Sequence, residues 1–214
     1  MDEYTGVAPG VRELDGLTIS KVSVGRGDNN CYLLRCRSTG EQVLIDAAAE
    51  PLTLLELCDH QLAGVVTTHR HWDHWQRALP QVVEATGART YAGEPDVAGI
   101  DVPTDVALTH GDIIRCGEAK LRVIRLTGHT PGGVALLYDD LAGNPHLFTG
   151  DSLFPGGVGN TFGDAEAFSS LLGDVEIRIF GVLPDETWVY PGHGRDTTLG
   201  AERPALPEWR SRGW

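Results

Sequence analysis

The sequence predicts a layered α/β domain in which two packed β-sheets are covered by outer helices. Short segments rich in Val, Ile and Leu alternate with turn residues, and stretches with apolar residues at helical spacing lie between them. The second half of the chain repeats the order of the first: a meander, a helix and a strand. No residue-level repeat and no linker divides the chain, so we expect one domain over residues 1–214.

The segments that carry this pattern follow one another in a regular order. In the first half we expect a meander of strands at Leu17–Gly25, Asn30–Cys36 and Gln42–Asp46. Next we expect a helix over Pro51–Gln61, a buried strand over Gly64–Thr68 and a helix from about His74 to Thr86. The second half predicts strands at Lys120–Leu126, Val134–Tyr138 and His146–Thr149, a helix over Ala165–Phe180 and a last strand at Thr187–Tyr190.

Composition and charge limit the classes of function. The chain has 214 residues, 41% of them hydrophobic, which suits one soluble globular domain with a sizeable core. Its formal charge of -13 disfavours nucleic acid as a partner, because phosphate binding needs a basic surface. No apolar run approaches the roughly 18 residues of a membrane span, and Met1–Asp15 is acidic and polar, so we expect a cytoplasmic protein with no membrane partner. The cysteines form no CxxC pair and are expected to be reduced and buried: Cys31, Cys36, Cys58 and Cys116.

The strongest chemical signal is the run Thr68-His-Arg-His-Trp-Asp-His74 at the exit of a predicted strand. It holds three imidazoles and one carboxylate, at His69, His71, Asp73 and His74. In an extended segment His69 and His71 point the same way, because the pleat has a period of two. Asp73 and His74 fall where the next helix is expected to begin. One short turn therefore presents two pairs of ligands to two neighbouring metal ions.

Three more potential ligands follow predicted strands further along the chain, at His129, Asp151 and His193. Glycine stands beside each of them, which lets the backbone turn sharply and approach closely. Because open α/β sheets commonly build ligand sites beyond the carboxyl ends of their strands, we expect four strand ends to converge. Imidazoles with a few carboxylates suit zinc, and iron or manganese accepts a similar set. The absence of thiolate from the set favours an open catalytic site over a closed structural one.

The complete pattern of ligands resembles the metallo-β-lactamase superfamily. Within it, the motifs that begin at Gly128 (Gly-His-Thr-Pro-Gly-Gly), Gly150 (Gly-Asp-Ser-Leu-Phe) and Pro191 (Pro-Gly-His-Gly) are similar to those of the glyoxalase-II-like branch. The short length resembles the compact single-domain members of that branch. The resemblance spans most of the chain and implies a four-layer αββα sandwich with the site at one edge of the inner sheets.

Carried over position by position, the resemblance implies a centre of two divalent cations, with zinc favoured over iron or manganese. It implies one cation bound by three histidines, a second bound by one aspartate and two histidines, and a bridging aspartate: His69, His71 and His129; Asp73, His74 and His193; and Asp151. Such a centre lowers the pKa of a shared water toward about 7 and yields the hydroxide that attacks a thioester or ester carbonyl. Asp73 is the expected catalytic residue, because it can orient the hydroxide and accept its proton.

The function that follows is hydrolysis of a small acyl-thiol or ester by a glyoxalase-II-like enzyme. Three alternatives stay open: a mononuclear iron persulfide dioxygenase, a lactonase, and an inactive metal-binding module. Asn160 and Phe162 stand where such dioxygenases usually carry Arg and Asp, which counts against the first alternative. Trp75-Gln-Arg stands where glyoxalase II enzymes have glycines, which changes the groove beside the metals. Only Gly194–Trp214 follows His193, so we do not expect the helical domain that binds glutathione in full-length glyoxalase II.

Several other side chains near these motifs have an ordinary structural interpretation. Three histidines lack the strand-end setting and are expected in structural or solvent roles: His60, His110 and His146. Two tryptophans flank the first motif, where packing is favoured over a role as cleft wall: Trp72 and Trp75. Three arginines either contact an anionic substrate or pair with structural carboxylates: Arg70, Arg77 and Arg195. The glycine-rich segment 155–162 is expected to pass close to the metals.

Overall fold

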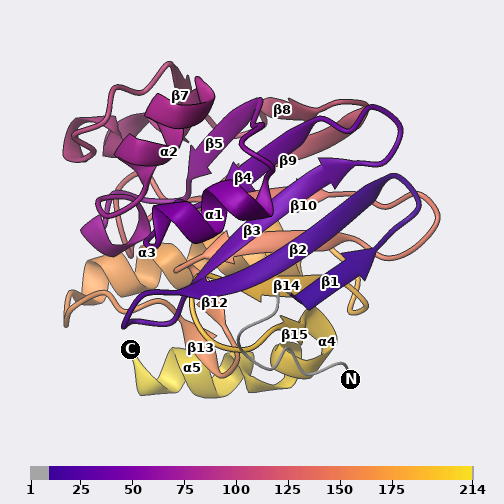
Figure 1. The fold of residues 1–214 in the computed structure, drawn as a ribbon. Coiled ribbons are helices and arrows are strands. Elements are labelled where there is room, and N and C mark those ends of the chain that lie inside the picture. Colours follow the sequence, from indigo (N-terminus) through magenta and orange to yellow (C-terminus); the bar gives the residue numbers. More distant parts are fainter. Residues whose placement is uncertain (1–9, 214) are drawn as a thin grey trace.

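The computed structural model describes residues 10–213, which form two β-sheets packed face to face with helices on their outer sides (Figure 1). The first sheet has seven strands in chain order: β1 (Gly10–Glu13), β2 (Leu17–Val24), β3 (Asn29–Cys36), β4 (Gln42–Ile45), β5 (Gly64–Thr67), β6 (Arg89–Gly93) and β7 (Val106–Leu108). The second sheet runs in the order β15-β14-β11-β10-β9-β8: β8 (Ile113–Cys116), β9 (Ala119–Arg125), β10 (Val134–Tyr138), β11 (His146–Gly150), β14 (Trp188–Pro191) and β15 (Thr197–Thr198). A short ribbon joins β12 (Leu153–Phe154) to β13 (Gly157–Val158).

Each sheet begins as an antiparallel meander and then crosses over through a helix to a parallel strand. The α-helices are α1 (Pro51–Leu57), α2 (Leu79–Thr86), α3 (Ala165–Val175), α4 (Leu199–Glu202) and α5 (Leu206–Arg212). Shorter helical turns are η1 (Trp72–His74), η2 (Glu94–Gly99), η3 (Glu176–Phe180) and η4 (Arg203–Ala205). Helix α1 connects β4 to the parallel strand β5, and α3 connects β11 to the parallel strand β14. The repeat of meander, helix and strand in the two halves is therefore confirmed.

The apolar core is divided into three layers that match this order of sheets and helices. The central layer lies between the sheets and contains Tyr32 and Phe148, whose ring centroids are 5.3 Å apart in an edge-on arrangement. A second layer lies between the first sheet and helices α1 and α2, and a third lies between the second sheet and helices α3 and α5. Burial of each large side chain in these layers contributes roughly 1.5–3 kcal/mol. The expected four-layer αββα arrangement is confirmed.

Two of the predicted helix boundaries are wrong. The helix expected from His74 begins at Leu79 instead, because His74 closes the short turn η1 and Trp75 after it has a non-helical φ of -148°. Pro80 in the first turn of α2 then favours a new start there. The helix expected to reach Gln61 ends at Leu57, since Asp59 and His60 take left-handed φ values of 51° and 56°.

Several short strands and the C-terminal helices were not predicted from the sequence. These elements are β1, β6, β7, β8, β12, β13, β15, α4 and α5. Four of these strands, β7, β12, β13 and β15, have only two or three residues, which is too few to show a period of two. Among residues 10–213, no helix is long and apolar enough to cross a bilayer. The cytoplasmic location stays a prediction, and so does the extent of the domain, because residues 1–9 and 214 lie outside the described range.

All four cysteines are free and buried, as predicted. The buried histidine of β11, His146, is also structural, since its Nδ1 lies 2.8 Å from the hydroxyl of Tyr190. Burial, together with the charge of Arg12, lowers the pKa of His146 from 6.5 to about 4. The unfolded chain therefore binds more protons at His146 than the folded protein does between these two values. The stability that neutral His146 contributes is present above pH 6.5 and is lost as the pH falls to about 4.

The substitution His146→Gln is expected to flatten the pH dependence of unfolding. Glutamine keeps a hydrogen-bonding group near Tyr190 but does not titrate. Between pH 7 and pH 4 the free energy of unfolding of the variant should fall by on the order of 3 kcal/mol less than that of the wild type, since each pKa unit is about 1.4 kcal/mol. Urea titrations at several pH values measure this difference. The exposed His110 supplies the control His110→Gln, and a His146→Gln profile that superimposes on the wild type contradicts the assignment.

Candidate metal centre

The structure brings all seven predicted ligands together where β5, β9, β11 and β14 end. Three overlapping groups have their ligand atoms within 4.8 Å of one another: His69, His71 and His129; His69, His74 and Asp151; and Asp73, His74 and His193. The first and third groups are the two ligand sets that the sequence resemblance implies. The convergence of strand ends that the sequence predicts is present.

The closest contacts in this cluster are between imidazole nitrogens. His71 Nδ1 lies 2.9 Å from His129 Nε2, and His74 Nε2 lies 3.2 Å from His193 Nε2. Asp151 lies between the two pairs, because its Oδ2 is 3.6 Å from His129 Nε2 and 3.5 Å from His193 Nε2. A single carboxylate therefore reaches both groups, as a bridging ligand must.

Oxygen atoms outside the cluster fix the orientation of several of these rings. Three imidazoles donate Nδ1–H to such an oxygen: His74 to Asp46 Oδ2 at 2.9 Å, His129 to the carbonyl of Asn160 at 2.7 Å, and His193 to the carbonyl of Gly27 at 2.8 Å. With the proton on Nδ1, the lone pair of each ring is on Nε2 and faces the other ligands. This is the arrangement in which a neutral imidazole binds a metal.

Two buried atoms at the centre have no hydrogen-bond partner among residues 10–213, although Asp151 Oδ1 lies 3.5 Å from His74 Nε2. His69 Nε2 and Asp151 Oδ1 are buried and accept no hydrogen bond from the described part of the chain. A buried polar atom without a partner costs about 1–3 kcal/mol, so native proteins rarely keep one. A divalent cation held by these ligands would satisfy both atoms, and the set of imidazoles and carboxylates suits zinc, iron or manganese. The residues present therefore fit a metal centre.

The electrostatics of the cluster favour positive charge at its middle. Burial and then the neighbouring His74 hold the pKa of His69 well below its usual range. Burial opposes a charge on His74 as well, but Asp46 and Asp151 outweigh it and raise the pKa of His74 to about 10. Burial would raise the pKa of Asp151, yet its interactions with His74 hold it below the usual range. The carboxylates that stabilise a proton on His74 also stabilise a cation in its place.

Asp46 is a functional residue that the sequence reasoning missed. Its carboxylate is buried and accepts hydrogen bonds from the backbone N–H of Thr68 at 2.7 Å and from Thr68 Oγ1 at 2.8 Å, besides the bond from His74. The Thr68 hydroxyl in turn lies 3.1 Å from His69 Nδ1. Asp46 thus orients His74 directly and His69 through Thr68. A carboxylate directly after the apolar residues Val43-Leu-Ile45 was the available signal, since a buried charge needs partners.

Polar residues at the start of β3 were also missed. Asn30 Nδ2 donates to the carbonyls of Pro191 and Gly194, at 2.9 and 3.0 Å, on both sides of His193. Asn29 Nδ2 donates to Asp73 Oδ2 at 3.1 Å. These two amides tie the His193 loop and Asp73 to the first sheet. Two consecutive buried asparagines were the signal in the sequence, although their partners are more than 40 residues away along the chain.

The remaining candidates lie around the cluster or away from it. His60 and His110 are exposed and outside it, as expected. Trp75 is buried and donates Nε1–H to the carbonyl of Arg70 at 3.0 Å, so its packing role is confirmed. The packing role favoured for Trp72 is wrong, because its side chain is 53% exposed; the guanidinium of Arg77 lies 5.3 Å from its ring centroid. Contact between substrate and the arginines stays a prediction.

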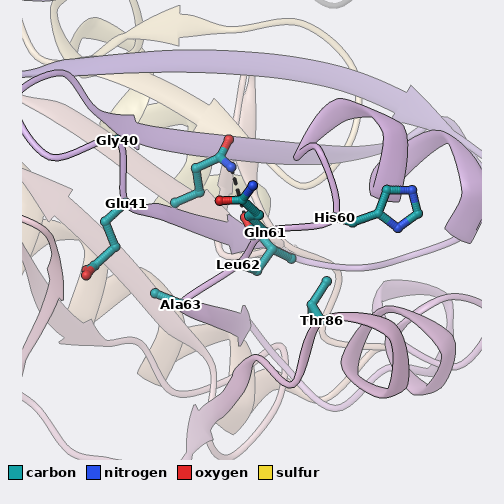
Figure 2. Close-up of a pocket in the computed structure, with 8 residues that line it drawn as sticks. Gly40, Glu41, His60, Gln61, Leu62, Ala63 and Thr86 are labelled. Atoms are coloured by element: carbon teal, nitrogen blue, oxygen red, sulfur yellow. Dashed lines mark hydrogen bonds between the residues drawn. The ribbon is translucent and has the colours of Figure 1, made fainter.

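A separate surface depression of about 360 Å³ lies at the opposite end of the first sheet (Figure 2). It is lined by residues at the start of β4, before β5 and at the end of α2, whereas the first run of predicted ligands follows β5. Gln42 occupies part of it, because its Nε2 donates to the carbonyls of Cys58 and Gln61 at 2.9 Å each. The depression contains no group of metal ligands from the described residues and is not part of the candidate centre.

Glycine at position 192 is required by the close approach of the His193 loop to the ligands. A Cβ atom there would lie 2.2 Å from Asp151 Oδ1 and 2.8 Å from His74 Cε1. We expect Gly192→Ala to displace both ligands and lower cation affinity by about 100-fold, while most of the apolar core stays intact. Metal analysis after gel filtration and the melting temperature measure the two effects. Gly173→Ala is the control, since a Cβ there meets no atom within 4 Å; full metal content in Gly192→Ala would contradict the geometry.

Comparison with known proteins places this site in a family. The family model of the metallo-beta-lactamase superfamily matches residues 24–193, a range that contains all seven predicted ligands. The hydroxyacylglutathione hydrolase of Cereibacter sphaeroides is 36% identical over 169 residues, which cover 78% of this chain and 62% of that protein. The chain thus spans less than two thirds of the length of this curated relative.

Two solved structures are similar over most of the chain. ETHE1 from Myxococcus xanthus has a TM-score of 0.75 and is 28% identical, covering 90% of this chain and 84% of that one. TTHA1623 in a di-iron-bound form has a TM-score of 0.70 and is 31% identical, covering 86% of this chain and 96% of that one. Sequence and fold agree, and the chain belongs to the metallo-β-lactamase superfamily.

Proposed function

We propose that the protein is a metal-dependent hydrolase of a small thioester or ester, of the glyoxalase-II type. The proposal rests on the convergence of five imidazoles and two carboxylates, with two buried atoms at their centre that have no hydrogen-bond partner in the described chain. The 36% identity to a hydroxyacylglutathione hydrolase supports a thioester substrate. The likeness to a protein solved in a di-iron-bound form supports a centre of two cations.

The proposed centre consists of two subsites that share one bridging ligand. The three-histidine subsite is formed by His69, His71 and His129, the aspartate subsite is formed by Asp73, His74 and His193, and Asp151 bridges them. Zinc is the cation that this set of ligands favours, and iron or manganese suits it as well. Bound cations supply acidity to a coordinated water and polarise the substrate carbonyl.

Asp73 is the proposed catalytic residue. Its side chain is 31% exposed, so water and substrate reach it, and its Oδ2 lies 3.6 Å from His193 Nε2. The bond from Asn29 fixes the direction of the carboxylate. Asp73 orients the attacking water and takes one of its protons while the water oxygen bonds to the acyl carbon. The carbon–sulfur bond then breaks, and the proton passes to the departing thiolate, which leaves a carboxylic acid and a thiol.

Two exposed aromatic side chains beside the centre supply apolar surface for the substrate. Phe162 is 70% exposed, and its ring centroid lies 5.7 Å from that of His71 and 6.0 Å from that of His129. Trp72 follows His71 directly. Large rigid rings of this kind contact the apolar part of a small ligand. We therefore expect an acyl-thiol of modest size as the substrate partner.

A single-iron oxidoreductase that acts on a thiol or persulfide is the second candidate. The likeness to the ETHE1 structure, at 28% identity, fits this alternative. In that case the three-histidine subsite would hold the iron, because imidazole ligands suit iron as well as zinc. The two candidates differ in the number of cations per chain and in their need for oxygen.

Elemental analysis of protein purified without added metal, combined with a panel of substrates, tests the proposal. The panel contains an S-lactoyl thiol, a lactone and a persulfide. Two cations per chain and release of thiol from the S-lactoyl substrate are the expected results. One iron per chain with oxygen uptake on the persulfide would replace the hydrolase proposal by the alternative. Protein that binds no cation and turns over none of the three would overturn both.

A further inference from the structure

We propose that Asp96 is a positioning residue that sets the cation affinity of the three-histidine subsite. This inference rests on the proposed metal centre. Asp96 lies in the short turn η2 and is 0% exposed. Its Oδ2 accepts hydrogen bonds from the backbone N–H of Arg70 at 3.0 Å and from Thr130 Oγ1 at 2.6 Å, and its Oδ1 accepts one from the N–H of Gly132 at 2.8 Å.

The three donors belong to the two loops that carry the ligands of this subsite. Arg70 stands between His69 and His71, whereas Thr130 directly follows His129. The bonds join positions 26 and 34 residues apart in the chain. One carboxylate therefore holds the first histidine loop against the second and fixes the separation of their imidazoles.

Close packing around η2 leaves little room for this connection to shift. A Cβ atom at Gly132 would lie 2.5 Å from the backbone nitrogen of Asp96, and one at Gly93 would lie 1.9 Å from the carbonyl oxygen of Gly132. On the other side, a Cβ at Gly99 would lie 2.8 Å from Cδ of Arg70. Backbone therefore meets backbone at the start of η2, and the Arg70 side chain packs against its end. This packing fixes the position of the Asp96 carboxylate relative to both loops.

The chemistry of these bonds requires a carboxylate. All three partners are donors, so an amide at position 96 would turn an N–H group toward at least one N–H or O–H group. A buried anion is costly unless it is hydrogen-bonded, and the nearest cationic side chain, Arg70, is 45% exposed with Nε 4.0 Å away. The three donors therefore stabilise Asp96, and Asp96 in return holds the loops together.

The effect of Asp96 is expected to be confined to one subsite. The aspartate subsite is held by other groups, namely Asp46, Asn29 and Gly27, none of which contacts Asp96 through a hydrogen bond in the described chain. Loss of the Asp96 bonds lets the His71 and His129 rings separate without moving His74 or His193. A role in general packing would instead weaken both subsites and the fold together.

Zinc titration of the metal-free protein tests this assignment, with a chromophoric chelator as competitor. We expect Asp96→Asn to weaken one of two sites by about 10–100-fold and to leave the other within about threefold. His71→Ala serves as the reference that removes the three-histidine subsite, so the site retained by Asp96→Asn must match the site retained by His71→Ala. Cobalt substitution gives each site a visible spectrum, so the site retained by Asp96→Asn can be compared with the site retained by His71→Ala.

A second pair of variants covers the case in which Asp96→Asn does not fold. Thr130→Val removes one donor without a change of size and is expected to weaken the same site by about tenfold, whereas Thr130→Ser keeps the hydroxyl and restores it. Asp105→Asn is the matched control, because Asp105 likewise accepts from a backbone N–H and a hydroxyl, both of Thr90, but lies outside the centre. Unchanged affinities in Thr130→Val, or equal losses at both sites, would overturn the inference. Wild-type protein that binds no zinc would instead overturn the proposed function.

Discussion

Replacement of Asp73 by asparagine is expected to lower kcat for thioester hydrolysis by about 10³-fold. Asparagine has nearly the shape of aspartate and keeps one oxygen that a cation can bind, but it takes no proton from water. Because the Asp73 side chain is 31% exposed and outside the apolar layers, the free energy of unfolding should change by less than about 1 kcal/mol. Steady-state kinetics on protein of known metal content measure the first effect, and urea titration measures the second.

The exposed Asp101 provides the matched control for this variant. Asp101→Asn removes the same charge from the protein without contact to the centre, so its kcat should equal that of the wild type. A loss of activity in both variants would point to the net charge rather than to a proton acceptor. Wild-type kcat in an Asp73→Asn protein that holds both cations would show that another group accepts the proton.

Removal of the cations by a chelator is expected to abolish turnover and to lower the melting temperature by about 10 °C. A ligand present at 1,000 times its Kd stabilises the folded state by about 4 kcal/mol, and 1 kcal/mol corresponds to roughly 2–4 °C for a chain of this size. Without cations, His69 Nε2 and Asp151 Oδ1 are buried with no hydrogen-bond partner from residues 10–213. Differential scanning calorimetry before and after chelation measures the shift.

Readdition of single metals distinguishes a specific centre from general stabilisation by salt. Zinc, iron or manganese should restore the melting temperature, and magnesium should not, because it prefers oxygen ligands over the imidazoles that dominate this centre. Chelated protein that keeps its melting temperature and its activity would contradict the proposed role of the cluster.

The positions of the seven predicted ligands were accessible from the chain alone because their signal is local. Four of them lie within six residues, and the others stand beside glycines after apolar strands, where a turn is required. The layered class followed in the same way from apolar periodicity, which depends only on near neighbours in the chain. Such features can be recognised in the sequence without knowing which residues pack against them.

Tertiary contacts decided the features that sequence reasoning missed. The start of α2 at Leu79 depends on how Trp75 packs and on the turn η1, not on the apolar spacing. The hydrogen bonds of Asp46 and Asp96 come from donors 22 to 36 residues away, and a single carboxylate in the sequence does not reveal which donors those are. An apolar side chain is stabilised by burial against any apolar neighbour. A buried polar atom instead needs a particular partner at a particular angle, and that partner is brought into place only when the chain folds.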